Sequence, residues 1–268
     1  MNTEIMIPLQ QKLLCGKQMF DVELTTNCNK KCHLCPREKL TRTNKKMTEK
    51  TFTLLCKWLP DECDVFFAGF GEPLLHDSCT DFIRKLHNSG RKTSIMTNGI
   101  LLTDEKINQL FSAGLDKLQI SIIQKTDLGL IPYFTKLIPV KYQKCIIFNI
   151  IKEKEMPDAS EELSFLKTHG WKYCIKLAHN RAGLLYPADC GTELKTCATF
   201  FCDTCINADG EIHICSNDIN GEYNIGTITS MTFEELTEYK KQFFGNKQIC
   251  SICSQCTDEY RLKHFEEI

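Results

Sequence analysis

The sequence predicts an α/β fold in which a parallel sheet is built from successive strand–helix units. Short apolar runs alternate with helical patterns over the first two thirds of the 268 residues, and this alternation is typical of a parallel sheet. The predicted strands are residues 20–25, 64–69, 92–97, 117–122, 144–150 and 173–177. The predicted helices are residues 48–59, 77–89, 103–113, 128–138 and 158–169. Six such units are too few to close an eight-stranded barrel.

Local signals support the helix boundaries. Thr103 precedes Asp104 and Glu105, and acidic residues in the first turn are typical of a helix start. Gly90 and Gly114 follow two predicted helices, where a left-handed residue often ends the helix. Parallel β/α folds place their chemistry at the carboxyl ends of the strands. We therefore expect functional residues in the loops that follow each strand.

The pattern changes after about residue 180. Asp209 and Gly210 predict a β-hairpin between two short strands, and a helix is expected near residues 232–243. The sequence thus divides into an N-terminal extension (1–19), a β/α region (20–180), a linker (181–196) and a small α+β domain (197–268).

Composition narrows the classes of partner. The formal net charge is −1, so no basic face is implied and nucleic acid is not expected as a partner. No apolar run approaches the roughly 18 residues that a bilayer span needs, so no membrane association is expected. The N-terminal segment lacks the apolar stretch of a signal peptide, and we expect a cytoplasmic protein.

Seventeen cysteines indicate metal ligation or redox chemistry rather than disulfides in such a protein. Cys28, Cys32 and Cys35 follow the first predicted strand with the spacing C-x3-C-x2-C. Three thiolates can hold three irons of a cubane cluster and leave the fourth open, whereas most electron carriers have four cysteine ligands. The alternatives are a zinc loop or three structural cysteines. Zinc sites usually close four ligands from paired C-x2-4-C elements, and no partner pair follows nearby.

This cysteine loop resembles the signature of the radical S-adenosylmethionine (SAM) superfamily. The resemblance implies a partial (β/α)6 barrel that is open on one side. It also implies a 4Fe–4S cluster on Cys28, Cys32 and Cys35 whose open iron chelates SAM. In that family, one electron cleaves SAM to methionine and a 5′-deoxyadenosyl radical, which abstracts hydrogen from an unactivated carbon. Leu34 is a departure, because the family usually has an aromatic residue before the third cysteine.

Further segments resemble SAM-binding motifs of the same family. Gly69-Phe70-Gly71-Glu72-Pro73 at the end of the second strand is similar to the GGEP motif, whose backbone binds the SAM amino group. The resemblance extends to Thr97 and Asn98 after the third strand and to Ser121 at the end of the fourth, near the methionyl and ribose parts of SAM. Arg181, after the sixth strand, could pair with the SAM carboxylate. Each segment alone is also compatible with an ordinary turn.

The C-terminal cysteines resemble the auxiliary-cluster domains called SPASM and Twitch. Cys197 and Cys215 fit the opening C-x12-G-x4-C pattern, and the shorter Twitch form, with one auxiliary 4Fe–4S cluster, is the better match. The other two ligands come from Cys250, Cys253 and Cys256, and the sequence leaves the pair open. Cys202 and Cys205 are interpreted as spare hairpin cysteines, with a ligand swap or a radical-quenching thiol as alternatives. A zinc ribbon is the competing interpretation of this region.

Three functional hypotheses follow. The first is modification of a ribosomally made peptide, such as cross-linking or epimerisation, with a separate peptide-recognition protein. The second is a small-molecule or carbohydrate dehydrogenase of the 2-deoxy-scyllo-inosamine dehydrogenase type. The third, from another class, is a non-catalytic iron–sulfur or zinc protein. Both enzymatic hypotheses require SAM, two 4Fe–4S clusters and an electron donor such as flavodoxin or ferredoxin.

Overall fold

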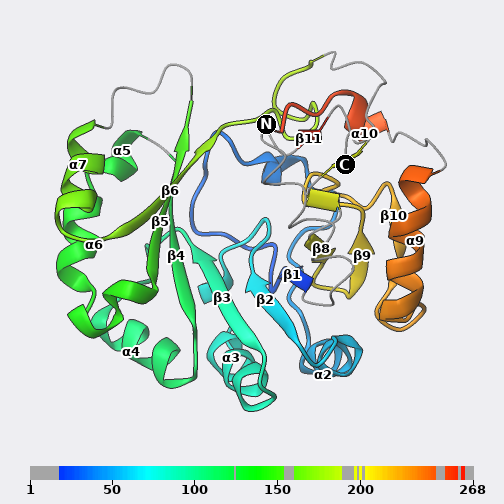
Figure 1. The fold of residues 1–268 in the computed structure, drawn as a ribbon, viewed down its shortest axis with the longest axis horizontal. Coiled ribbons are helices and arrows are strands. Elements are labelled where there is room, and N and C mark those ends of the chain that lie inside the picture. The colour runs from blue at the N-terminus through cyan, green and yellow to red at the C-terminus, as the bar shows by residue number, and fades with distance from the viewer. Residues whose placement is uncertain are drawn as a thin grey trace.

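Six parallel strands in chain order form the main part of the sheet (Figure 1). The computed structural model describes residues 18–123, 125–153, 160–188, 196–197, 199–200, 203–245, 251–258 and 261–262. The strands are β1 (Gln18–Val22), β2 (Cys63–Phe67), β3 (Lys92–Thr97), β4 (Lys117–Ile122), β5 (Ile146–Lys152) and β6 (Lys172–Leu177). Each pairs in parallel with the next. The predicted α/β class and parallel sheet are confirmed.

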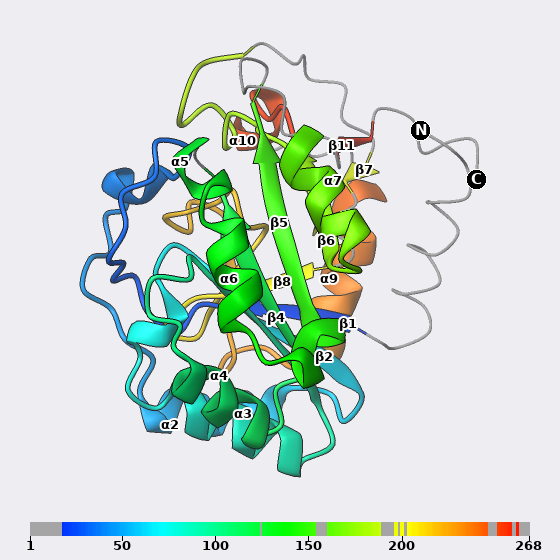
Figure 2. The same ribbon diagram turned by 90° about the vertical axis from the view of Figure 1, so that its left-hand side faces the viewer.

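Helices cover the outer face of this curved sheet, as Figures 1 and 2 show. They are α2 (Glu49–Trp58), α3 (Cys79–Asn88), α4 (Asp104–Ser112), α5 (Lys125–Leu128), α6 (Ile131–Leu137) and α7 (Ser160–Thr168). There are also three short 3-10 helices in the described chain: η1 (Pro36–Lys39) before α2, η2 (Pro73–Leu75) before α3 and η3 (Val140–Cys145) before β5. The helix predicted over residues 128–138 is confirmed as α6, and the short helix α5, which ends at residue 128, was not predicted. Pro132 lies in the first turn of α6. The backbone N–H that proline lacks would have no hydrogen-bond partner within the helix at this position.

Side-chain caps and apolar faces explain why these helices form and where they pack. The Thr103 hydroxyl accepts a 3.0 Å hydrogen bond from the backbone N–H of Lys106 and so caps α4. Phe52 of α2 and Phe82 of α3 are fully buried, and their rings stack with centroids 3.8 Å apart. The core therefore lies between the helices and the outer face of the sheet, which leaves the strand ends free for a site.

The segment after residue 196 extends the same sheet. Strand β8 (Asp203–Ile206) pairs in parallel with β1, and β9 (Glu211–His213) and β10 (Asn224–Thr227) follow in antiparallel order. The described sheet has nine strands, ordered β10-β9-β8-β1-β2-β3-β4-β5-β6, and β10 and β6 are its two edges. The hairpin predicted at Asp209 and Gly210 is confirmed as the β8–β9 turn. The predicted division into four segments stays a prediction, and strands from both sides of the linker share one sheet.

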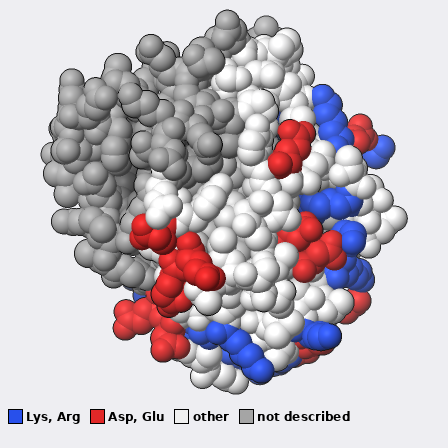
Figure 3. All heavy atoms as spheres, turned by 90° about the vertical axis from the view of Figure 1, so that its right-hand side faces the viewer, with Lys and Arg blue, Asp and Glu red and all other residues white. Residues whose placement is uncertain are grey.

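The remaining C-terminal elements lie beside this hairpin (Figure 1). They are β7 (Thr196–Cys197), α9 (Phe233–Gly245), α10 (Ser251–Ser254) and β11 (Arg261–Leu262), and β7 pairs with β11 in antiparallel fashion. On the face in Figure 3, acidic and basic side chains are interspersed, in keeping with the net charge of −1. Across the part of the chain that the structure describes, none of the helices has the length and apolarity to cross a membrane.

Candidate active site

A cavity of about 390 Å³ lies at the carboxyl ends of the strands. We call it the first cavity. The structure brings almost all predicted SAM-site residues to its wall: Cys28, Cys32, Cys35, Gly69, Gly71, Glu72, Thr97, Asn98, Ser121 and Arg181. Pro73 does not line it. That residue is buried at the start of η2, where its ring fixes the backbone after Glu72.

The loop that carries the first three cysteines is held at its start and in its middle. At its start, the backbone N–H of Thr26 donates a 3.0 Å hydrogen bond to the carbonyl of Lys45. In its middle, Lys30 Nζ lies 2.5 Å from Asp127 Oδ1, and both side chains are mostly buried. Asp127 also accepts a 3.0 Å hydrogen bond from the N–H of Ile123, after β4. The ion pair therefore fixes the cysteine loop against the β4 end of the sheet.

Burial keeps two of these thiols protonated in the absence of a metal. It raises the pKa of Cys32 to about 11, although the charge of Lys30 acts in the opposite direction. Burial likewise raises the pKa of Cys35. Iron binds the thiolate and releases the proton. The three cysteines line one wall of one cavity, which is the arrangement that three ligands of one cluster need.

Glu72 connects the loops that follow β2 and β3. Its carboxylate accepts hydrogen bonds from the Thr97 hydroxyl at 2.8 Å, the Asn98 N–H at 2.8 Å and the Leu74 N–H at 3.1 Å. The Asn98 side chain in turn donates to Asn29 Oδ1 at 2.8 Å and to Cys28 Sγ at 3.7 Å. The motif residues and the cysteine loop are thus one hydrogen-bonded unit. Burial raises the pKa of the Glu72 carboxyl, whereas these hydrogen bonds act to lower it.

Gly71 permits the close approach of two backbones. A Cβ at this position would lie 2.0 Å from the carbonyl oxygen of Thr25 and 2.7 Å from that of Asn27. The adjacent N–H of Glu72 donates a 2.8 Å hydrogen bond to the same Asn27 carbonyl. Only glycine fits here without moving the cysteine loop.

A buried ion pair that the sequence analysis missed supports the same motif. Arg42 and Glu23 form a two-point contact, with Nη2 3.1 Å from Oε2 and Nη1 bonded to Oε1. Glu23 Oε2 also accepts from the N–H of Phe70 at 3.2 Å, and Arg42 Nε donates to the carbonyl of Ile219 at 3.1 Å. Alternation along β1 could have indicated that Glu23 shares the inward face with Asp21. Its partner, 19 residues away, could not be predicted.

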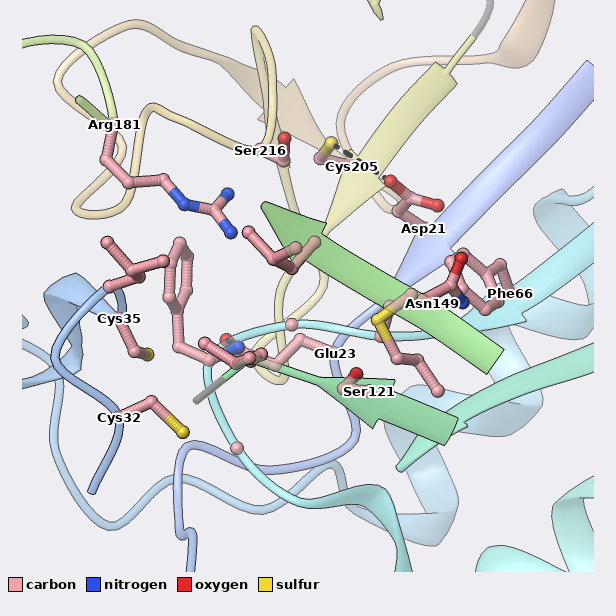
Figure 4. A pocket seen from close by; sticks show the side chains of 18 of the residues that line it. Asp21, Glu23, Cys32, Cys35, Phe66, Ser121, Asn149, Arg181, Cys205 and Ser216 are labelled. Atoms are coloured by element: carbon pink, nitrogen blue, oxygen red, sulfur yellow. Dashed lines mark hydrogen bonds between the residues drawn. The ribbon is translucent and has the colours of Figure 1, made fainter. Parts of the chain in front are cut away.

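The cavity wall away from the cysteine loop carries polar side chains beside apolar ones such as Phe66 (Figure 4). Asp21 of β1 lies opposite Cys205 of β8 in the parallel register, and Cys205 Sγ is 4.0 Å from Asp21 Oδ2. Burial, and secondly the charge of Asp203, raise the pKa of Asp21 from 3.8 to about 8. Asn149 and Lys176 line the cavity from β5 and β6. Neither Asp21 nor Cys205 was predicted as a site residue.

Arg181 and Ser121 reach the cavity from other sides. Figure 4 shows the guanidinium of Arg181 directed into the cavity between Cys35 and Ser216, and Ser121 at the tip of β4. Arg181 has φ 52°, a left-handed conformation that is uncommon for a residue with a side chain. This conformation ends the extended run after β6.

A second cavity, of about 30 Å³, lies beside the first. Four cysteines line it: Cys197, Cys215, Cys253 and Cys256. Thr199, Cys215 and Asp258 border both cavities. Cys202 and Cys250 lie outside the described residues. No three His, Cys, Asp or Glu side chains of the described ranges are grouped as a site for one metal ion.

The four cysteines of the second cavity are partly exposed, and some of their thiols accept hydrogen bonds. Burial raises the pKa of Cys197 to about 12 and raises that of Cys215 as well. The backbone N–H of Asn217 donates to Cys215 Sγ at 3.4 Å, and its side chain donates to Cys256 Sγ at 3.9 Å. Hydrogen bonds of this kind stabilise a thiolate and influence the potential of an iron–sulfur cluster. Four thiols around one small space are a donor set that suits such a cluster.

Known proteins resemble both the sequence and the fold. Residues 22–124 match the family model of the Radical SAM superfamily. The tungsten-containing aldehyde ferredoxin oxidoreductase cofactor-modifying protein of Pyrococcus furiosus is 30% identical over 104 residues, which are 38% of this chain and 29% of that protein. A probable GTP 3′,8-cyclase of Methanothermobacter marburgensis is 32% identical over 103 residues, which are 37% of this chain and 33% of that protein. The matches thus span about a third of these relatives.

Solved structures share the fold over most of the chain. BtrN in complex with AdoMet and 2-DOIA has a TM-score of 0.68 at 18% identity, covering 91% of this chain and 94% of BtrN. Streptococcus suis SuiB bound to the precursor peptide SuiA has a TM-score of 0.61 at 11% identity, covering 99% of this chain and 81% of SuiB. Members of the superfamily are enzymes that use a 4Fe–4S cluster and SAM. Residues 22–124 thus match the radical SAM family model, and the open parallel sheet has the fold of these solved structures.

Proposed function

We propose that this chain reductively cleaves SAM and abstracts hydrogen from a carbon of its substrate. Cys28, Cys32 and Cys35 hold the SAM-binding 4Fe–4S cluster. When bound, that cluster and SAM supply the 5′-deoxyadenosyl radical. The observation that carries the proposal is that these thiols line one cavity with the Gly-Glu-Pro loop, Asn98 and Arg181.

The other residues of the first cavity bind and orient SAM in this proposal. The backbone at Gly69, Gly71 and Glu72 presents hydrogen-bonding groups to the SAM amino group, and Pro73, which does not line the cavity, fixes the backbone after Glu72. Thr97, Asn98 and Ser121 contact its methionyl and ribose parts. Arg181, directed into the cavity, pairs with the carboxylate. Glu72 acts through the backbone that it holds, since its carboxylate is occupied by three hydrogen bonds.

We further propose that Cys197, Cys215, Cys253 and Cys256 hold the auxiliary 4Fe–4S cluster. The support is their arrangement around the second cavity. Four thiolates saturate such a cluster, which then transfers electrons rather than binding substrate. Because Cys215 borders both cavities, the electron path to the substrate would be short. A donor such as flavodoxin or ferredoxin would supply electrons from outside.

A peptide is the proposed substrate, recognised with the help of a separate protein. SuiB shares the fold and was solved with its precursor peptide. In addition, a PqqA peptide cyclase of Bradyrhizobium diazoefficiens is 29% identical over 103 residues. The second candidate is oxidation of a small molecule or carbohydrate, which the extent of the match to BtrN favours. The non-catalytic hypothesis is dropped because the superfamily consists of enzymes.

The direct test is formation of 5′-deoxyadenosine from SAM by the anaerobically reconstituted, reduced protein, measured by liquid chromatography and mass spectrometry. We expect the native chain to form it and Cys32→Ala to form none. Cys56→Ala is the matched control, because Cys56 is partly buried on α2 and does not line either cavity. Continued formation by Cys32→Ala would exclude the proposed function.

A further inference from the structure

We propose that Cys205 donates a hydrogen atom to the substrate radical and that Asp21 then returns a proton to the Cys205 sulfur. This inference rests on the proposed function and specifies its outcome. Return of hydrogen to the same carbon makes the net reaction an epimerisation rather than an oxidation or a cross-link.

The position of Cys205 distinguishes it from the other described cysteines. Cys28, Cys32, Cys35 and Cys215 also line the first cavity, and each belongs to one of the two proposed cluster sites. Cys205 lines the first cavity but not the second. It is therefore the one cavity cysteine of the described residues that no cluster needs.

The thiol has a partner built into the sheet. Parallel pairing of β1 with β8 places Cys205 directly opposite Asp21. The Sγ–Oδ2 separation of 4.0 Å is within the range of a weak S–H···O hydrogen bond. Side chains on the inner face of a barrel-like sheet are usually apolar and fill the interior. An acid and a thiol at this level, facing a cavity, instead provide groups that can react with a substrate.

The two walls of the cavity carry different chemistry, as Figure 4 shows. Cys32 and Cys35 lie on one side of the view, and Asp21 and Cys205 lie on the other. A substrate carbon between them would lose hydrogen toward the cysteine loop and regain it from the Cys205 side. Removal from one face and delivery to the opposite face inverts the configuration of that carbon.

The protonation states suit these roles. Burial, followed by the charge of Asp21, raises the pKa of Cys205 well above its ordinary value, so the sulfur carries the hydrogen that it is to donate. The raised pKa of Asp21 keeps its carboxyl largely protonated near neutral pH. Both shifts have the same cause, which is the position of the pair away from water.

The step balances in atoms and electrons. The substrate radical takes the hydrogen atom of Cys205, which forms a C–H bond, breaks the weaker S–H bond and leaves a thiyl radical. One electron from a low-potential donor of the ferredoxin or flavodoxin class converts the thiyl radical to a thiolate. The Asp21 carboxyl gives its proton to that thiolate, restores the thiol and regains a proton from solvent.

The test uses the reduced, two-cluster protein with SAM as the only substrate, in D2O. Thiol hydrogens exchange with D2O, whereas carbon-bound hydrogens do not. Without a substrate between the walls, the deoxyadenosyl radical takes deuterium from Cys205. The readouts are the deuterium content of 5′-deoxyadenosine and the residue that carries a spin-trap adduct, both measured by mass spectrometry.

We expect native protein and Cys56→Ala to give deuterated 5′-deoxyadenosine, with the spin trap on Cys205. Cys205→Ala should lose the deuterium. Cys205→Ser, which keeps the shape of the side chain but has a much stronger O–H bond, should lose it too. Deuterium that persists in both variants, or is absent from the native product, would overturn the role of Cys205 while 5′-deoxyadenosine still forms. Absence of 5′-deoxyadenosine from every protein would instead overturn the proposed function, and this inference with it.

Discussion

The backbone N–H of Asn98 donates a 2.8 Å hydrogen bond to Glu72 Oε2, and this bond joins the loops that follow β2 and β3. Glu72 is 2% exposed and accepts two further hydrogen bonds, from Thr97 and Leu74. The acidic residue of the Gly-Glu-Pro motif therefore organises the backbone around the cavity. Its contribution can be measured separately from SAM binding.

Glu72→Ala should lower the free energy of unfolding by about 3 kcal/mol, because buried donors lose their acceptor. Urea denaturation measures this loss. Glu62→Ala is the control, since Glu62 is exposed and a surface change of this kind alters stability by about 0.5 kcal/mol or less. Equal stability of the two variants would show that the hydrogen bonds of Glu72 do not hold the loops together.

Gly71→Ala should prevent assembly of the first cluster. The new Cβ would meet the backbone of Thr25 and Asn27, so the cysteine loop would have to move. Gly129→Ala is the matched control, because the nearest atom to a Cβ there is 3.7 Å away. The measurement is iron content after reconstitution. Native iron content in Gly71→Ala would contradict the close approach of the two loops.

Replacement of two adjacent lysines of the cysteine loop should have very different effects on stability. Lys30 pairs with the buried Asp127, and loss of one partner of a buried ion pair costs about 3 kcal/mol or more. Lys31 pairs with Glu38 in solvent, with exposed fractions of 83% and 73%, and such pairs contribute about 0–1 kcal/mol. Thermal or urea denaturation of Lys30→Ala and Lys31→Ala compares them. A similar loss in both variants would contradict the anchoring role of Lys30.

Asp21 should make the native protein less stable as the pH rises. Its folded-state pKa is about 8 and its ordinary value is 3.8, so between these limits the folded chain keeps a proton that the unfolded chain releases. The contribution of Asp21 to the free energy of unfolding therefore decreases as the pH rises between these two pKa values. Asp21→Asn removes the decline, and its stability relative to the native chain should increase from about pH 5 to about pH 8. A difference that is constant with pH would contradict the raised pKa.

Features that depend on a local pattern of residues could be predicted from the sequence. Strands β2 to β5 are short apolar runs between helical segments, and Thr103 caps the start of α4 with its own side chain. The short helix α5 was missed, whereas α6 lies within the predicted range of residues 128–138. The cysteine spacing and the Gly-Glu-Pro motif indicated residues that the structure brings to one cavity, because strand order alone determines which loops meet.

Features that depend on distant pairing were not predictable. The pairing of β8 with β1 joins segments 184 residues apart, and it alone places Cys205 beside Asp21. The C-x2-C spacing alone leaves Cys205 as a spare hairpin cysteine, with a ligand swap or a radical-quenching thiol as alternatives. The contact of Arg42 with Glu23 likewise requires the three-dimensional path of the cysteine loop. Neither apolar periodicity nor cysteine spacing carries information about such contacts.

Iron content after anaerobic reconstitution tests the central claim most directly. The native chain should bind about eight irons, and the Cys28/Cys32/Cys35→Ala variant about four. A Cys197/Cys215/Cys253/Cys256→Ala variant should also bind about four, and sulfide should follow iron in each protein. Native protein with about four irons, none of which remain in the first variant, would contradict the two-cluster account. Zinc in place of iron at the four C-terminal cysteines would also contradict the two-cluster account.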